Sequence, residues 1–230
     1  MTAARGDRRE LKKRVRSTKG RTPSSKLWLD RQLNDPYVAR AKREGFRSRA
    51  AYKLAEMDDK FHFLKSGARV VDLGAAPGGW SQVAAKRVGA GEGRGRVVAI
   101  DVLDMAVIPG VDFVRLDFTS DEAPHRLKSM LDGLADVVLS DMAANATGHR
   151  KTDHLKIIAL AETAALFARE VLKPRGTFIC KVLQGGTEHE LLADLKRDFS
   201  TVKHVKPPAS RADSAELYVL AAGYRGSNRT

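Results

Sequence analysis

The sequence of 230 residues has a formal net charge of +13, 43% apolar residues and a single cysteine. No apolar run approaches the length of a membrane span, the charged N-terminus is unlike a secretory leader, and one cysteine excludes an internal disulfide. We therefore expect a cytoplasmic protein without membrane contact. The excess of positive charge predicts a polyanionic partner.

The positive charge is concentrated at the N-terminus. Residues 1–26 contain ten Lys or Arg side chains and two acids, so that this segment has a net charge of +8. Because the segment lacks apolar periodicity, we expect a basic, disordered tail that is attracted to phosphate, although a tail that only aids solubility has the same composition. Residues 27–230 contain no internal repeat or linker, which predicts one domain. Nothing in the sequence requires a dimer, and we expect a monomer.

The first predicted elements are two helices that precede the sheet. Residues 35–44 have a helical pattern that ends at Gly45, and Ser48 is placed to cap a second helix that runs to Phe61. We expect these two helices to form an N-terminal cover for the domain.

Apolar strand-like segments then alternate with helices. Strands are predicted at 69–73, 96–100, 111–116, 135–140 and 177–182, helices at 81–88, 121–131 and 153–172, and a helix stop with a turn at 173–176. A helix at 188–199 is followed by strands at 201–205 and 216–221, with no helix between them. The pattern predicts an α/β fold with a doubly wound, mostly parallel sheet whose last two strands form an antiparallel pair.

A glycine-rich turn after the first strand carries the most specific signal. Asp72 ends the strand, and Gly74 and Gly78 lie in the turn that opens the next helix, so that a small ligand can approach the backbone. The spacing Asp-x-Gly-x-x-x-Gly-Gly differs from the Gly-x-Gly-x-x-Gly of dinucleotide sites, which disfavours a nucleotide-dependent oxidoreductase. An acid at this position suits a ligand with a cationic amino-acid end, such as S-adenosylmethionine (SAM). An ordinary glycine-rich turn is the alternative.

Acidic residues follow three successive strands. Asp101 is positioned to accept hydrogen bonds from a ribose diol, Asp117 could accept one from an adenine amino group, and Asp141 follows the fourth strand. Each alone could be a solvated loop residue. Because the carboxyl ends of parallel strands meet at one edge, together they predict a nucleoside pocket above the glycine turn.

Two charged residues on the last predicted strands extend this edge. Lys181 interrupts an apolar run that also contains Cys180, a predicted buried thiol, and is either a snorkelling lysine or a proton acceptor in a partly desolvated site. Glu216 opens the last strand and is either a structural acid or part of the site. If that strand runs antiparallel beside the fifth, Asp141, Lys181 and Glu216 converge.

Several motifs in order resemble the FtsJ/RrmJ heat-shock methyltransferases, the ribosomal RNA large subunit methyltransferase E group. They are Asp-Leu-Gly-Ala-Ala-Pro-Gly-Gly-Trp (72–80), Ser-Asp-Met-Ala (140–143), Lys-Val-Leu-Gln-Gly (181–185) and Ser-x-Glu-Leu-Tyr (214–218), with further similarity at 28–37 and 45–54. The similarity covers roughly residues 27–224. It departs from the family at Ala144, where proline is expected, and at the unusually basic segment 149–154.

The resemblance implies a Rossmann-like SAM-dependent enzyme that methylates the ribose 2′-hydroxyl of a uridine in the A-loop of 23S rRNA within the large ribosomal subunit. It assigns the family's catalytic tetrad to Lys53, Asp141, Lys181 and Glu216, and SAM contacts to Gly78, Trp80, Asp101, Asp117 and Asp141. Lys181 would accept the hydroxyl proton, beside the like charge of Lys53 and the counter-charge of Asp141, while Glu216 would orient Lys53 or the ribose. A noncatalytic RNA-binding ribosome-assembly factor on the same fold is the alternative. No metal site is indicated.

Basic residues flank this edge on both sides and could grip RNA phosphates, or could simply be solvated. They are Lys42, Arg43, Arg47, Arg49, Lys203, Lys206 and Arg211. Tyr37 and Tyr52 could stack on an unstacked base, or pack in the core.

Overall fold

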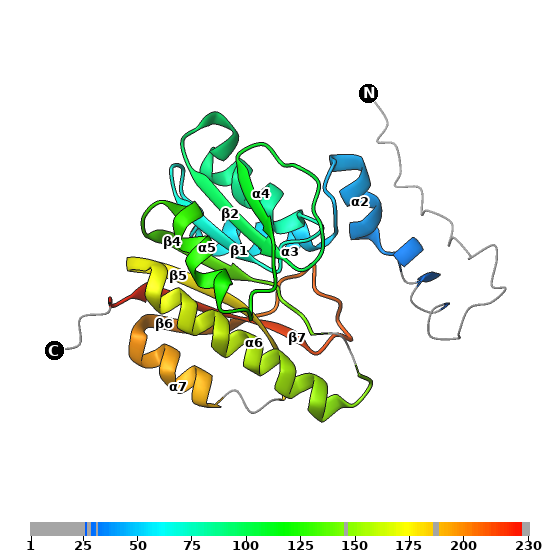
Figure 1. Ribbon diagram of the computed structural model, residues 1–230. Helices are drawn as coiled ribbons and strands as arrows, with labels where there is room; N and C mark the ends of the chain where they lie inside the picture. Colours follow the sequence, from blue (N-terminus) through cyan, green and yellow to red (C-terminus); the bar gives the residue numbers. More distant parts are fainter. Residues whose placement is uncertain (1–25, 27–28, 31, 145–146, 186–188, 227–230) are drawn as a thin grey trace, which may run out of the picture.

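The computed structural model describes residues 26, 29–30, 32–144, 147–185 and 189–226 (Figure 1). Apart from Lys26, the predicted basic tail at 1–26 lies outside the described residues. Among the described residues, no helix is long and apolar enough to span a membrane.

A seven-stranded sheet forms the centre of the molecule, with the strand order β3-β2-β1-β4-β5-β7-β6. The strands are β1 (Arg69–Leu73), β2 (Arg96–Asp101), β3 (Val111–Arg115), β4 (Ala135–Ser140), β5 (Leu172–Leu183), β6 (Phe199–Val205) and β7 (Glu216–Tyr224). The first five strands are parallel, and β7 runs antiparallel between β5 and β6. The predicted fold class is therefore confirmed. The strand order reverses between β1 and β4, where ligands bind in open α/β sheets.

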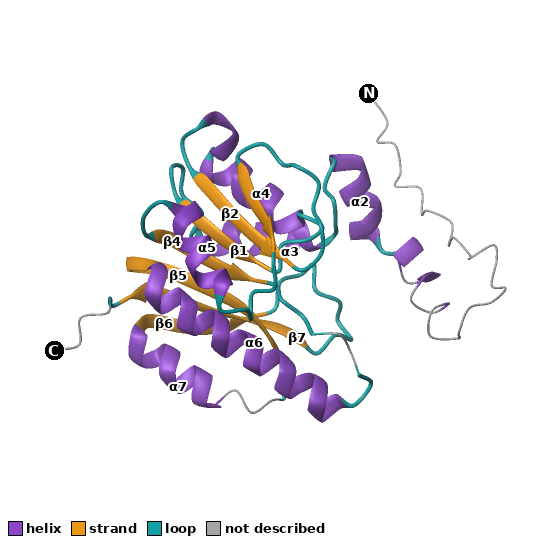
Figure 2. Cartoon of the chain, viewed as in Figure 1, coloured by secondary structure: helices purple, strands orange, loops and turns teal. Residues whose placement is uncertain are grey.

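Helices cover both faces of the sheet (Figure 2). One face packs against α5 (Glu122–Leu131), α6 (Arg150–Val171) and α7 (His189–Asp198), and the other against α3 (Ala50–Phe61) and α4 (Gly79–Val88). The structure also contains α2 (Pro36–Glu44), which ends at Gly45 as predicted, and the short 3₁₀ helix η1 (Ala90–Glu92).

The alternation of strand side chains decides which residues reach which face. Leu139, Ile179 and Tyr218 all pack in the core between the sheet and helices α3 and α4. Because side chains two residues apart share a face, Asp141 and Lys181 continue this face beyond Leu139 and Ile179, and Glu216 precedes Tyr218 on it. The sheet thus presents the three predicted site residues to α3, the helix that carries Lys53.

Two local predictions are wrong. Ser48 does not cap α3: the cap is Arg49, without a side-chain hydrogen bond, and the buried Ser48 hydroxyl lies against Gly79 instead. The predicted turn at 173–176 is part of β5, where the pairing with β4 shifts register between Ala135 and Val137. The chain therefore passes from α6 into an irregular strand rather than into a separate turn.

Candidate active site

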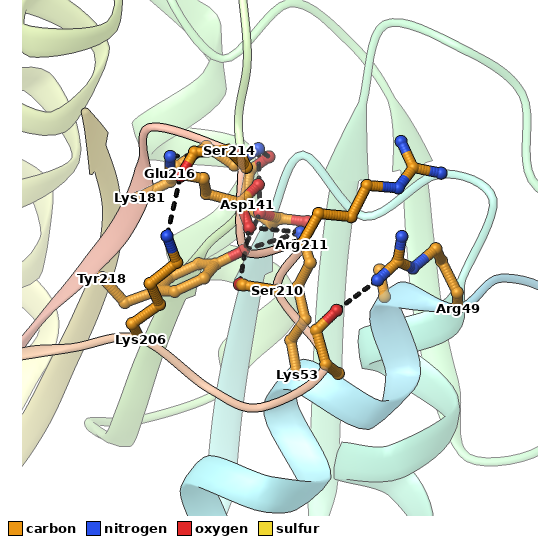
Figure 3. Close-up of polar contacts among 12 residues, drawn as sticks. Arg49, Lys53, Asp141, Lys181, Lys206, Ser210, Arg211, Ser214, Glu216 and Tyr218 are labelled. Carbon is orange, nitrogen blue, oxygen red and sulfur yellow. Dashed lines mark hydrogen bonds and ion pairs between the residues drawn. The ribbon is translucent and has the colours of Figure 1, made fainter. Parts of the chain in front are cut away.

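Five side chains form one connected polar network at the carboxyl edge of the sheet (Figure 3). Lys181 Nζ lies 2.8 Å from Asp141 Oδ1 and donates to the Asp141 carbonyl oxygen at 2.7 Å. Tyr218 donates its hydroxyl to the same Asp141 Oδ1 at 2.8 Å. Lys53 Nζ lies 2.5 Å from Glu216 Oε1 and 3.3 Å from the Tyr218 hydroxyl oxygen. The predicted convergence of Asp141, Lys181 and Glu216 is confirmed, and Lys53, which the family resemblance adds to them, pairs with Glu216.

The strand register explains why these residues meet. In the antiparallel β5–β7 pair, Lys181 is opposite Tyr218 and Leu183 is opposite Glu216. Asp141 follows β4, the other neighbour of β5, and its backbone N–H donates to Leu73 at the end of β1. Four strands and one helix therefore fix the network, so that its geometry depends on the whole fold.

The network is shielded from solvent on most sides. The side chains of Lys53, Glu216, Lys181 and Asp141 are 11–17% exposed, and Tyr218 is completely buried. Burial raises the pKa of Tyr218 well above its ordinary value, and the Asp141 and Glu216 carboxylates raise it further. The phenol is therefore a permanent hydrogen-bond donor that joins the two lysine–carboxylate pairs.

Tyr218 is the site residue that the sequence analysis missed. It stands in the motif at 214–218 and follows Glu216 by two residues, which puts both side chains on one face of a strand. That spacing was the available signal. Because the strand is apolar, a tyrosine that only packs in the core explained the sequence equally well.

The glycines of the turn beside the network are required by close contacts within the protein, and the predicted contact of a ligand with this backbone stays a prediction. Gly74 has φ +78°, and a Cβ there would lie 2.8 Å from the Met142 side chain. Gly78 has φ +109°, and a Cβ there would lie 2.8 Å from Ile108. No side chain caps the N-terminus of α4, where backbone N–H groups favour an anion.

Asp72 lies completely buried beneath this turn. Its Oδ2 accepts a hydrogen bond from the Ser81 hydroxyl at 2.6 Å, whereas Oδ1 is buried and has no partner in the described structure. Burial raises the pKa of Asp72 to about 7; the Ser81 hydrogen bond opposes this, and the Asp141 and Asp101 carboxylates add to it. An unpartnered carboxylate oxygen under a glycine cradle fits a ligand with a cationic group.

Asp101 and Asp117 occupy the expected strand ends. Asp101 accepts backbone hydrogen bonds from Ala76 at 2.9 Å and Leu103 at 2.8 Å, so that it ties the glycine turn to the segment after β2. Asp117 is exposed and accepts from the Thr119 backbone and hydroxyl, which holds its pKa below the ordinary range. Their contacts with a nucleoside stay predictions.

Trp80 lies in the core, with only 2% of its surface exposed. Its indole N–H donates to the Ala50 carbonyl at 2.9 Å, and its ring centroid is 5.4 Å from that of Tyr218. The Trp80 side chain therefore contacts both α3, through Ala50, and the network, through Tyr218. Its contact with SAM stays a prediction.

Several residues of the predicted phosphate-gripping rim have their charged groups bonded within the protein, and their contact with phosphate stays a prediction. Arg49 and Arg211 both pair with the buried Asp35. The other internally bonded members are Arg47, which donates to three carbonyl oxygens, and Lys206, which donates to the Ala212 and Ser214 carbonyls. Lys42, Arg43 and Lys203 are exposed and still suit a phosphate-binding surface.

The two tyrosines of the cover pack rather than face solvent. The Tyr37 and Tyr52 ring centroids are 5.4 Å apart, and their hydroxyls donate to Glu56 and Glu44. Cys180 is buried as predicted, and burial raises its pKa to about 12. In the described part of the chain, no three His, Cys, Asp or Glu residues gather as metal ligands would.

Among the cavities formed by the described residues, two lie at opposite edges of the sheet. A cavity of about 320 Å³ adjoins the network and includes Lys53, Glu216, Arg49 and Arg211 in its lining. A larger one of about 770 Å³ lies at the amino edge, where Arg69, Arg96, Asp112, Asp136 and Lys173 contribute to its lining. Two of the five network residues, Lys53 and Glu216, thus line the smaller of these two cavities.

The comparisons with known proteins match methyltransferases. The model of the FtsJ-like methyltransferase family matches residues 46–224. The chain is 68% identical over 221 residues to "Ribosomal RNA large subunit methyltransferase E" of Azorhizobium caulinodans, covering 96% of this chain and 92% of that protein. It is 67% identical to the protein of the same name from Xanthobacter autotrophicus, covering 98% of this chain and 89% of the relative.

Solved structures show the same fold. A ribosomal RNA methyltransferase of Plasmodium falciparum superposes with a TM-score of 0.70 at 32% identity, covering 79% of this chain and 100% of that one. Human methyltransferase-like protein 13, solved in complex with SAH, superposes with a TM-score of 0.51 at 12% identity, covering 78% of this chain and 85% of that one. The second likeness concerns the fold alone.

Proposed function

The chain belongs to the FtsJ-like methyltransferase family, and we propose that it transfers a methyl group from SAM to a ribose 2′-hydroxyl of ribosomal RNA. The observation that carries the proposal is the buried network of two lysines, two carboxylates and Tyr218 beside the glycine turn. We further propose that the target is a uridine in the A-loop of 23S rRNA within the large ribosomal subunit.

The residues around the glycine turn fit SAM as the methyl donor. Gly74 and Gly78 give the turn its left-handed backbone, and the uncapped start of α4 suits a carboxylate. Asp72 has an unpartnered oxygen for a cationic group, and Asp101 can accept from a ribose diol. When bound, SAM supplies a methyl group on a sulfonium that a nucleophilic oxygen can attack.

Lys181 is proposed as the base. As a neutral amine, its Nζ would accept the proton that the 2′-hydroxyl loses as this oxygen attacks. Asp141, 2.8 Å away, then stabilises the ammonium that results. Because the transfer is an in-line displacement, most of the remaining catalysis is positioning.

Lys53 and Glu216 are proposed to position the ribose. Glu216 holds Lys53 at 2.5 Å, and Ser210 donates to the same Glu216 oxygen at 3.0 Å. A lysine fixed in this way, at the wall of the 320 Å³ cavity, can hold the attacking hydroxyl or an adjacent oxygen of the substrate.

Ribosomal RNA is proposed as the substrate because curated relatives with about two thirds of their residues identical bear that activity in their names. The net charge of +13 supports a polyanionic partner. Two alternatives are less well supported. A noncatalytic assembly factor would not need the connected network, and the turn lacks the Gly-x-Gly-x-x-Gly spacing of a nucleotide-dependent oxidoreductase.

The test is methyl transfer from labelled SAM to large ribosomal subunits from cells that lack this protein, with ribose methylation mapped by nucleotide. We expect one modified uridine in 23S rRNA. Binding of the subunit without methyl transfer would favour the assembly factor. Stabilisation of the protein by NAD but not by SAM in a thermal-shift assay would favour the oxidoreductase.

A further inference from the structure

The segment 102–110 between β2 and β3 borders the glycine turn, yet its surface is unusually apolar. Val102, Leu103 and Val107 are 55%, 63% and 89% exposed. Met105 and Ile108 are buried and pack with Ala75 and Ala99, beside the turn. Since exposed apolar side chains contribute little to holding a loop in place, its polar contacts matter more.

Arg47, in the connection between α2 and α3, provides those contacts. One guanidinium nitrogen donates to the Ala106 carbonyl at 2.6 Å and to the Pro77 carbonyl at 3.4 Å, and the other donates to the Val107 carbonyl at 2.8 Å. One side chain therefore joins the segment 102–110 to the glycine turn.

The backbone around Arg47 is itself fixed by the helix that follows the turn. Gln82 of α4 accepts from the Arg47 backbone N–H at 2.8 Å and donates to the Gly45 carbonyl at 3.0 Å. A Cβ on Gly78 would lie 3.0 Å from Arg47 Nη1 and 2.9 Å from Met105 Sδ. Three segments far apart in the sequence thus meet with no spare room.

We propose that Arg47 is a positioning residue for SAM binding, which holds the segment 102–110 against the glycine turn instead of gripping RNA phosphate. Asp101 reaches both parts that Arg47 joins, because its carboxylate accepts from Ala76 in the turn and from Leu103 in the segment. Separation of the two parts would therefore displace the acid that is proposed to hold the ribose of SAM. The inference rests on the proposed function.

The planar fork of arginine is essential to this role. Two guanidinium nitrogens reach carbonyl oxygens of residues 77, 106 and 107, whereas the single ammonium of a lysine at the end of a flexible stem cannot span the same set. Lysine keeps the positive charge, however. The substitution Arg47→Lys therefore separates geometry from charge.

The experiment compares Arg47→Ala, Arg47→Lys and the matched control Arg43→Ala, an exposed arginine of the same cover. SAM affinity is measured by calorimetry, and kcat and the KM for SAM are measured with ribosomal subunits. For Arg47→Ala we expect SAM affinity to fall roughly ten-fold or more, as for lost hydrogen bonds from a charged group, with kcat at saturating SAM changed by less than about two-fold. Arg43→Ala should leave SAM affinity unchanged.

The variant Arg47→Lys tests the positioning role even if Arg47→Ala does not fold. It should show the SAM defect while its RNA affinity keeps the wild-type dependence on salt, because the charge is retained. Wild-type SAM affinity in Arg47→Lys, or an RNA defect alone in Arg47→Ala, would overturn the inference. Failure of the unaltered protein to bind SAM would instead refute the proposed function.

Discussion

Charged side chains gather at both edges of the sheet, but in different states. At the amino edge, Arg96 and Asp112 lie 3.0 Å apart with side chains 41% and 52% exposed, and Arg94 and Glu92 lie 2.7 Å apart at 58% and 70%. At the carboxyl edge, the pairs of Lys53 with Glu216 and Lys181 with Asp141 are 11–17% exposed and are joined through Tyr218. The ion pairs are exposed at the amino edge, whereas at the carboxyl edge they are mostly buried and joined through a tyrosine.

The difference matters because exposed and buried ion pairs have different costs. An exposed pair typically contributes about 0–1 kcal/mol and is screened by salt. A buried pair must first lose its hydration, which often exceeds the attraction gained, so a fold gains little stability from one. Groups kept in that costly state are therefore candidates for chemistry. Cavity size alone would favour the amino edge instead, since the larger of the two cavities lies there.

The largest expected effect separates the two edges directly. Lys181→Ala should lower turnover by roughly two to four orders of magnitude, the usual range for a positioned acid or base. SAM and RNA binding should persist, because Lys181 is proposed to act on the hydroxyl proton. The control is Lys173→Ala, which removes an exposed lysine paired with Asp136 at the amino edge. Equal single-turnover rates in the Lys181 variant and the wild type would refute its role.

The pH dependence of stability should distinguish the buried Asp72 from the exposed Asp112. The pKa of Asp72 is raised from 3.8 to about 7 by burial, so the folded protein holds a proton that the unfolded chain releases. Stability should therefore fall as pH rises from about 4 to about 7, by up to roughly 4 kcal/mol from this group. Urea unfolding across this range should show the fall reduced in Asp72→Asn. Asp112→Asn should retain it; an identical profile in both variants would contradict the assignment.

Tyr218→Phe tests whether the connection between the two pairs matters. The ring and its packing on Trp80 are kept, while the hydrogen bond to Asp141 is lost. Since a hydrogen bond to a charged group is worth about 1.5–3 kcal/mol, we expect turnover to fall by roughly one to two orders of magnitude. Melting temperature and SAM affinity serve as controls for folding. Normal turnover would mean that the two pairs act independently.

Much of this site could be predicted from sequence because it depends on regular structure. Strand alternation and the antiparallel last pair bring Asp141, Lys181 and Glu216 to one face, and both features follow from the apolar pattern. Tyr218 was missed because a tyrosine in an apolar strand has two equally good explanations. The internal hydrogen bonds of Arg47 and Arg49 could not be predicted, because their partners come together only in the folded chain. These partners are Asp35 and the carbonyls of residues 77, 106, 107 and 209.

Asp101→Ala should have a smaller effect, confined to cofactor binding. Loss of a ribose acceptor should weaken SAM binding by about 1–3 kcal/mol, as for a lost hydrogen bond to a charged group. The variant also loses the hydrogen bonds that the backbone N–H groups of Ala76 and Leu103 donate to Asp101, which should loosen the glycine turn and the segment 102–110. Calorimetry with the folded variant gives the answer. Unchanged SAM affinity would count against this placement of the ribose.

The smallest effect is expected where the amino-edge pair is broken. Arg96 donates to Asp112 at 3.1 Å through Nε and lies 3.9 Å from Asp132, with all three side chains at least 41% exposed. Arg96→Ala should lower the free energy of unfolding by less than about 1 kcal/mol and leave methyl transfer unchanged. The contribution of the pair itself is best isolated by a double-mutant cycle with Asp112→Ala. We expect a coupling energy of about 0.2–1 kcal/mol that declines as salt is added, because exposed charges are screened. A coupling of several kcal/mol, or one that salt does not reduce, would mean that exposure does not distinguish the two edges, and the network around Lys181 would then lose its main physical argument.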